Sequence, residues 1–272
     1  MMRPVFLSAS EPYPTRDREY WDSQHLANIR AAIRALCAQV LPHRPLVFGG
    51  HPAITPLVRS IAQRIHHDQQ QNEPDAPAPI VLTFRSRLYG DDRAGAIMTD
   101  AHDEYGSVVP PTAGRRNMSL LRMRYEMLGR PGMSFGAPLS IPDAEGLGAA
   151  RHRALETLDY AAGVFVGGME GVEREFRIFR SFHPNTPVFP IATSGAAAAR
   201  LLPEISDMPK PLHDALKEQT AYSVLFQQVL PAQVDRQIAP AWRPSDAQYS
   251  WTDHVDPAEL DRASPLTDGS IP

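Results

Sequence analysis

Cysteine and lysine are both scarce in this sequence. Cys37 is the only cysteine among 272 residues, which excludes an intrachain disulfide and is typical of a protein in a reducing compartment. Lysine occurs only as Lys210 and Lys217, so arginine supplies nearly all of the positive charge. No stretch approaches the ~18 apolar residues of a membrane-spanning helix, and the first residues lead directly into a predicted strand. We therefore expect a soluble, cytoplasmic protein with no membrane partner.

The chain also lacks any block of basic residues, and its formal net charge is −4. Duplex nucleic acid requires a broad positive surface, so we expect no nucleic-acid partner. Residues 231–272 carry seven acidic residues against three arginines, a balance equal to the whole net charge. We predict one domain over residues 1–230 and an acidic, proline-rich tail over 231–272, which either docks on another surface or is disordered.

Short β-branched or aromatic runs alternate with helical periods over the first 200 residues. This alternation predicts the α/β class, as a Rossmann-like doubly wound parallel sheet flanked by helices. The predicted strands are residues 4–8, 45–48, 79–84, 163–166 and 187–192. The predicted helices are residues 16–41, a helix from about residue 52 to 65, 117–129, 143–161, 172–180 and an alanine-rich helix after residue 195. Residues 66–78 are interpreted as a polar connector, and the irregular stretch 85–117 as a functional loop or lid.

Three turns connect a predicted strand to a predicted helix through glycine or small hydroxyl residues: Gly49–Gly50, Gly167–Gly171 and Thr193–Gly195. In a parallel sheet these turns share the carboxyl edge, where helix N-termini present N–H groups and partial positive charge. Glycine lets the backbone approach a ligand closely and adopt a positive φ. One such turn is common in α/β proteins, whereas three in one sheet favour a site for a phosphate-bearing ligand.

Three segments resemble the SLOG superfamily: VFGGHPAITPLV at residues 47–58, GVFVGGMEGVEREF at 163–176 and FPIATSGAAA at 189–198. That superfamily groups LOG and lysine-decarboxylase-like proteins with Smf/DprA proteins and the ligand-binding region of melastatin-type TRP channels. The resemblance covers about residues 4–200, and its most specific part is the second segment. It implies a Rossmann-like sheet that binds a nucleotide or nucleotide-derived ligand at the carboxyl edge.

The LOG members of this superfamily are phosphoribohydrolases with the motif PGGxGTxxE, whose last glycine and glutamate align with Gly171 and Glu175. Three positions depart from the motif: Gly167 replaces the proline, Met169 the second glycine and Val172 the threonine. LOG enzymes also carry an arginine on the preceding helix, and Arg124 is its best match. If the protein is an enzyme, the resemblance implies Glu175 and Arg124 as catalytic residues that stabilise a ribosyl cation and position water. The departures resemble the sensor branches more closely.

The predicted ligand-binding residues share a position at or near the carboxyl edge: Ser8, Ser10, Gly49, Gly50, His51, Arg85, Gly167, Gly168, Met169, Glu170, Gly171, Thr193, Ser194 and Gly195. Structural alternatives stay open for several of them. Glu175 gains from its helix dipole in any case, His51 can cap its turn, and Arg85 can be a solubilising loop residue.

Other chemistries lack their motifs. No HExxH occurs, and neither glycine turn matches GxGxxG or a P-loop, so we expect no metal site and no cofactor. We predict a sensor of an ADP-ribose-like or cyclic nucleotide signal in bacterial stress or antiviral defence, with a homo-oligomer and an effector protein as partners. The alternative is a LOG-like nucleoside 5′-monophosphate phosphoribohydrolase, and a third hypothesis is a scaffold whose tail recruits a partner.

Overall fold

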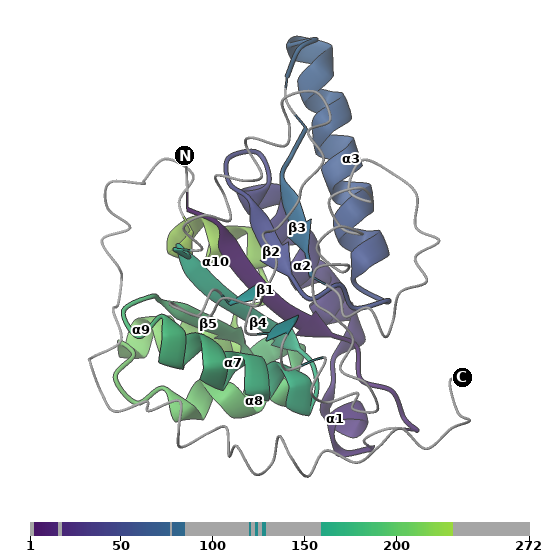
Figure 1. Cartoon of the computed structure of the whole chain (residues 1–272). Helices are drawn as coiled ribbons and strands as arrows, with labels where there is room; N and C mark the ends of the chain where they lie inside the picture. Colours follow the sequence, from purple (N-terminus) through teal and green to yellow (C-terminus); the bar gives the residue numbers. More distant parts are fainter. Residues whose placement is uncertain are drawn as a thin grey trace, which may run out of the picture.

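The computed structural model describes residues 3–15, 18–76, 78–84, 120, 123–124, 127–128 and 159–230. Within these ranges five strands form one parallel sheet in the order β3-β2-β1-β4-β5 (Figure 1). The strands are β1 (Val5–Ser10), β2 (Leu46–Phe48), β3 (Val81–Thr83), β4 (Ala162–Gly167) and β5 (Val188–Ile191). The predicted α/β, Rossmann-like class is confirmed.

The strand order places β1 in the middle of the sheet. From β1 the chain proceeds outward through β2 and β3, and then crosses to the other side of β1 to add β4 and β5. This reversal makes a topological switch point between β1 and β4, where Ser10 pairs with Gly167 at the carboxyl ends of the two strands. Sheets of this class bind ligands outside the carboxyl ends of their strands, near such a point.

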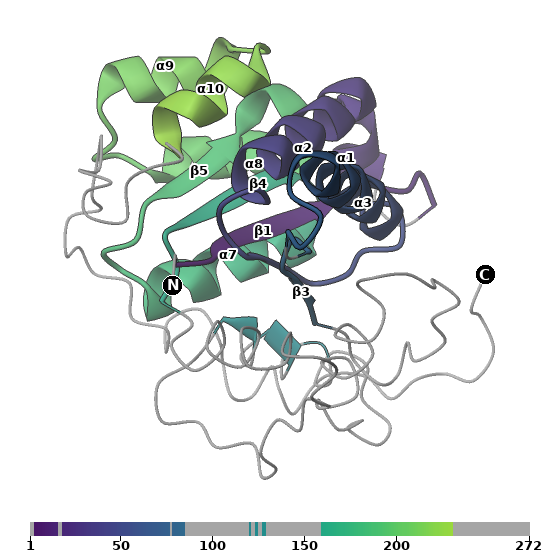
Figure 2. The ribbon, with the colours of Figure 1, turned by 90° about the horizontal axis from the view of Figure 1, so that it is seen from above.

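Helices cover both faces of the sheet, as a doubly wound fold requires. The helices α2 (Leu26–Val40), α3 (Thr55–Asn72) and α10 (Tyr222–Val229) lie on one face, and α7 (Glu170–Phe182) lies on the other (Figure 2). The buried stripe of α2 includes Cys37, and burial raises the pKa of this thiol to about 12. None of the helices in the described ranges has both the length and the apolar character needed to cross a membrane.

Shorter elements complete the described chain. They are α1 (Arg18–Ser23), the 3-10 turn η2 (Ala192–Ser194), α8 (Ala196–Leu201), the 3-10 turn η3 (Leu202–Glu204) and α9 (Lys210–Glu218). The helix α8 packs against both α1 and α7, and α9 packs against β5. The helices α9 and α10 were not predicted, although they lie inside the predicted domain.

A cluster of aromatic side chains, named here the α7 cluster, holds α7 against the sheet. The ring of Phe6 on β1 stacks on that of Phe179, with centroids 5.3 Å apart and planes inclined by 12°. Phe165 meets Phe176 edge to face at 5.1 Å, and Tyr160 meets Phe6 edge to face at 5.7 Å. All five rings are buried, and such pairs contribute ~0.5–1.5 kcal/mol beyond their buried area. This packing fixes where the first turn of α7 meets the edge of the sheet.

The single helix predicted over residues 16–41 is wrong, because the structure has two helices separated at Gln24 and His25. Gln24 forms an isolated antiparallel bridge with Gly195, and the amide of His25 donates to the carbonyl oxygen of Ser194 at 3.0 Å. The backbone here bonds to the turn after β5 instead of continuing one helix. A tertiary contact therefore overrides the helical period.

The polar connector predicted over residues 66–78 is also wrong in its first half, because α3 continues to Asn72. Local contacts support these turns, including one of 3.0 Å between the side chains of His67 and Gln71. Figure 1 shows this end of α3 projecting beyond the sheet. An exposed helix needs no apolar stripe, so hydrophobic periodicity does not reveal it.

Several predicted segments lie wholly or partly outside the described residues. These are the irregular stretches 85–117 and 131–142, most of the helix predicted over 143–161, and the tail 231–272. The described end of that helix, residues 159–161, is not helical. Of the helix predicted over 117–129, the described residues Leu120, Met123, Arg124 and Met127 are helical.

Gly195 occupies a position that does not accommodate a side chain. Its φ and ψ are 70° and −160°, a region that is essentially restricted to glycine, and a Cβ built there would lie 2.0 Å from the carbonyl oxygen of Ser23. We expect Gly195→Ala to lower the free energy of unfolding, measured by urea denaturation, by about 2 kcal/mol or more. Gly49→Ala is the matched control, because its Cβ would meet its nearest neighbour at 3.7 Å. Equal stability of the two variants would contradict this account.

Candidate functional site

The three glycine-containing turns lie at one edge of the sheet. Gly49 and Gly50 directly follow β2, Gly167 ends β4, and Thr193–Gly195 follows β5. Every strand pair is parallel, so all three turns are at carboxyl ends. The turns differ in how much of their backbone is already bonded within the fold.

The turn after β5 is bonded to neighbouring protein groups. The side-chain amide of Asn28 donates to the carbonyl oxygen of Thr193 at 2.7 Å, and the hydroxyl of Ser194 accepts the amide N–H of Gly167 at 2.8 Å. The residues that open α8, Ala196–Ala198, are buried. The main visible role of this turn is therefore to join α1, α2 and α8 to the sheet.

The backbone amides after β4 are also used within the fold. Gly167 donates to a serine hydroxyl, as above, and Gly168 donates to the carbonyl oxygen of Ser10 at 2.9 Å. The side chain of Val172 covers Gly168, since a Cβ built at Gly168 would lie 2.2 Å from the Val172 Cγ2. Met169 is buried, and its carbonyl oxygen accepts the amide of Val172 at 2.8 Å. These two glycine amides are thus already satisfied without a ligand.

A buried carboxylate is the centre of the candidate site. Glu175, in the second turn of α7, is 9% exposed. Its Oε2 accepts a hydrogen bond from the Ser8 hydroxyl at 2.6 Å, and its Oε1 accepts one from the Arg124 Nε–H at 3.0 Å. A buried carboxylate is costly unless it is paired and hydrogen-bonded, so both partners stabilise this position. We name these three residues the Glu175 network.

The Arg124 guanidinium also lies against the N-terminal turn of α7. A Cβ built at Gly171 would lie 3.0 Å from the Arg124 Nη2, so a side chain there would press on the guanidinium. The amide of Gly171 makes no hydrogen bond to a described residue, and helix N-termini carry partial positive charge. A cation and a helix N-terminus at one place favour anionic groups. The carboxylate of Glu175 is one such group. The arrangement can accept a further anionic group such as a phosphate.

Contacts behind Arg124 hold its helical segment in place. The carbonyl oxygen of Leu128 accepts a hydrogen bond from the His183 Nε2 at 2.7 Å, and that of Met127 accepts one from the Tyr160 hydroxyl. Burial lowers the pKa of His183, while the bond to the carbonyl oxygen opposes this effect. The segment is therefore anchored at the C-terminal end of α7 and at the start of β4.

Gly49 lies beside the Glu175 network. A Cβ built at Gly49 would come within 3.7–3.9 Å of the Met123 Cε, the Met127 Sδ and the Glu175 Oε1. Both methionines are buried, so apolar side chains and the carboxylate lie around the same position at the end of β2. Surroundings of low polarity strengthen the interaction between the carboxylate and the guanidinium.

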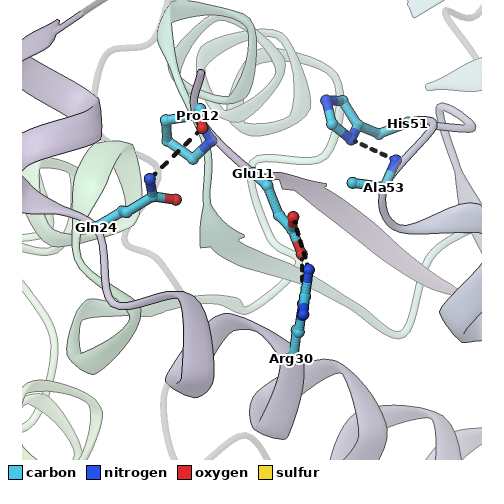
Figure 3. A network of polar contacts seen from close by, with 6 residues as sticks. All are labelled: Glu11, Pro12, Gln24, Arg30, His51 and Ala53. Carbon is cyan, nitrogen blue, oxygen red and sulfur yellow. Dashed lines mark hydrogen bonds and ion pairs between the residues drawn. The ribbon is translucent and has the colours of Figure 1, made fainter. Parts of the chain in front are cut away.

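His51 lies in the turn from β2 into α3. Its Nδ1 accepts a hydrogen bond from the amide of Ala53 at 3.3 Å (Figure 3), and its carbonyl oxygen accepts one from the Thr55 hydroxyl at 2.9 Å. Because Nδ1 accepts, the proton of the neutral ring is on Nε2. His51 therefore caps its own turn, and its ring has a fixed orientation at the carboxyl edge.

The predicted site residues fall into four groups. Those gathered at the Glu175 network are Ser8, Gly49, Arg124, Gly171 and Glu175. Four others lie at the same edge of the sheet: Ser10, Gly50, His51 and Glu170. Those bonded or packed within the fold are Gly167, Gly168, Met169, Thr193, Ser194 and Gly195. Arg85 lies outside the described residues. Among the described residues, no three His, Cys, Asp or Glu side chains are grouped so that they could hold a metal ion.

Four residues that shape the site were not predicted: Met123, Met127, Tyr160 and His183. The methionines follow an apolar helical pattern that is also typical of ordinary core residues. His183 contacts a carbonyl group 55 residues away, and no local pattern indicates such a partner. The sequence offered one pattern that indicates that this helix packs on the sheet, namely the helical spacing of the apolar residues around Arg124.

The burial of the Arg124–Glu175 pair predicts a measurable coupling. Both side chains are 12% exposed, so solvent screens this pair less than a surface pair. In a double-mutant cycle of Arg124→Met and Glu175→Gln, we expect urea denaturation to give a coupling energy of about 1–3 kcal/mol. The exposed pair Arg3–Asp159 is the control and should give about 0.5 kcal/mol or less. Equal coupling energies in the two cycles would show that burial does not strengthen the interaction between Arg124 and Glu175.

Comparison with known proteins places the chain in a family. The model of the SLOG cluster3 family matches residues 19–146 and 139–230, which together make up more than half of the chain. Both Arg124 and Glu175 lie within the matched residues. No curated protein and no solved structure matches the chain. The chain belongs to the SLOG cluster3 family, and its resemblance to the SLOG superfamily is thereby confirmed.

Proposed function

We propose that this protein binds a nucleotide-derived small molecule at the carboxyl edge of its sheet and acts as a sensor of that molecule. Membership of a SLOG family is consistent with a nucleotide-derived ligand. The main support is the position of Arg124, which bonds to Glu175 at 3.0 Å and lies against Gly171. A guanidinium and a helix N-terminus there combine their positive charge.

The Glu175 network offers complementary groups to a nucleotide. Phosphate oxygens accept hydrogen bonds from guanidinium groups and helix amides, so the phosphate would lie on Arg124 and Gly171. Each Glu175 oxygen accepts one described hydrogen bond and has a further lone pair for a ribose hydroxyl. ADP-ribose-like molecules and cyclic nucleotides carry phosphate together with ribose, and these are the ligands that we propose.

One feature favours binding over hydrolysis. Val172 stands where LOG enzymes have a threonine, and its methyl groups cover Gly168 instead of offering a hydroxyl. We propose signalling in bacterial stress or antiviral defence, through a homo-oligomer and an effector protein, as the context of such a sensor.

A thermal-shift panel of ADP-ribose, NAD and cyclic dinucleotides tests the sensor. We expect at least one ligand to raise the melting temperature increasingly with concentration, because a ligand that binds only the folded state stabilises it. Arg124→Met should weaken this binding about ten-fold or more, since it removes a charge-assisted contact. Arg3→Met, which removes an exposed arginine just before β1, is the matched control and should bind as the wild type does.

The outcomes separate three hypotheses. Melting curves that respond to no member of the panel would contradict the sensor and favour the scaffold. An equal loss of binding in the Arg124 and Arg3 variants would mean that the ligand responds to general positive charge, and it would contradict the proposed site.

The alternative function is a LOG-like hydrolase that cleaves a nucleoside 5′-monophosphate between its base and ribose 5-phosphate. The contact between Arg124 and Glu175 favours it, because these are the two residues that the resemblance implies for catalysis. Incubation with AMP and cytokinin-type nucleotides, followed by chromatography for the free base, tests this activity. We expect no more turnover than in the Glu175→Gln variant. Release of base that disappears in that variant would overturn the sensor.

A further inference from the structure

An aromatic pair at the carboxyl edge has no part in the Glu175 network. Tyr13, in the loop between β1 and α1, stacks on His51, with ring centroids 6.0 Å apart and planes inclined by 27°. Tyr13 is 43% exposed, whereas the rings of the α7 cluster are buried. A tyrosine that stacks on one neighbour and is still this exposed retains ring surface for a further partner.

The chain around Tyr13 restricts the movement of its ring. Pro12 and Pro14 flank it, so two neighbouring φ angles are fixed and Tyr13 itself is confined to extended conformations. Glu11 ties the same loop to α2 through two hydrogen bonds from Arg30, of 2.8 and 3.2 Å (Figure 3). A ring held in this way loses little conformational entropy when a ligand covers it.

The ring of His51 is held as firmly. The amide of Ala53 donates to its Nδ1, as Figure 3 shows, and Pro52 restricts its backbone. The stacked pair therefore bridges the loops that follow β1 and β2. These are the strands that bring the hydroxyl of Ser8 and the backbone of Gly49 to the carboxylate.

We infer that Tyr13, backed by His51, is the stacking surface for the base of the ligand, and that the ligand is a purine nucleotide rather than a base-free sugar phosphate. Stacking requires a flat aromatic face that is exposed and pre-oriented, and Tyr13 meets both conditions. A purine covers more of such a face than a pyrimidine does. This inference rests on the proposed function, in which the phosphate and the ribose lie on the Glu175 network.

Isothermal titration calorimetry with ADP-ribose and cyclic di-AMP tests the inference on the full chain. Tyr13→Ala should weaken the binding of the purine probes by roughly 5- to 150-fold, the range typical of base stacking on an aromatic side chain. Tyr13→Phe keeps the ring and should bind as the wild type does. Trp21→Ala removes another exposed aromatic ring, on α1, and is the matched control. Ribose 5-phosphate, which has no base, should not distinguish Tyr13→Ala from the wild type.

Each outcome decides the question. Wild-type affinity in Tyr13→Ala overturns the stacking surface and leaves the proposed function intact. Equal losses in Tyr13→Ala and Tyr13→Phe assign the effect to the hydroxyl, and an equal loss in Trp21→Ala assigns it to a general change of the surface. Both results overturn the inference. If neither purine probe binds the wild type, the proposed function fails for these ligands and the stacking surface fails with it.

Discussion

A carboxylate buried at the end of a parallel sheet needs a positive partner, and in this fold the partner comes from a distant part of the sequence. Glu175 bonds to Arg124, 51 residues away, and to Ser8, 167 residues away. Loss of either partner would leave a buried polar group unpaired, at a cost that small domains tolerate poorly. The packing of the α7 cluster and the anchoring of Leu128 by His183 both serve this contact, because they bring Arg124 to the first turns of α7.

The carboxyl edge has two parts. In one part the backbone groups stabilise the fold, and the other part presents a charged network and an aromatic ring that we propose contact the ligand. Around β4 and β5, the amides of Gly167 and Gly168 and the carbonyl oxygen of Thr193 are bonded to other protein groups. Around β1, β2 and the start of α7, the edge instead carries a charged network and an exposed aromatic ring. The same kind of glycine turn thus serves two purposes in one sheet, and its bonded neighbours decide which purpose it serves.

Local patterns predicted the class of fold and placed each strand within two residues of its observed bounds. They could not predict the break at Gln24, because its partner Gly195 lies far along the chain. At the site, Arg124 and Glu175 came from the family resemblance, and Ser8 came from its place at the end of a strand. The sequence does not reveal which backbone donors are already bonded. For that reason the turn residues were all predicted alike, and Tyr13, whose partner is in another loop, was missed.

The long crossover between β3 and β4 has a consequence for synthesis. The helix α7 follows this crossover, so the Glu175 carboxylate can meet the Arg124 guanidinium and the Ser8 hydroxyl only after the chain has returned to the sheet. Closing contacts of such sequence separation costs entropy and comes late in folding. A nascent chain that has emerged only as far as β3 has none of these pairings, because Arg124 and Glu175 both lie beyond β3 in the sequence. Recognition at this edge is therefore a property of the finished domain.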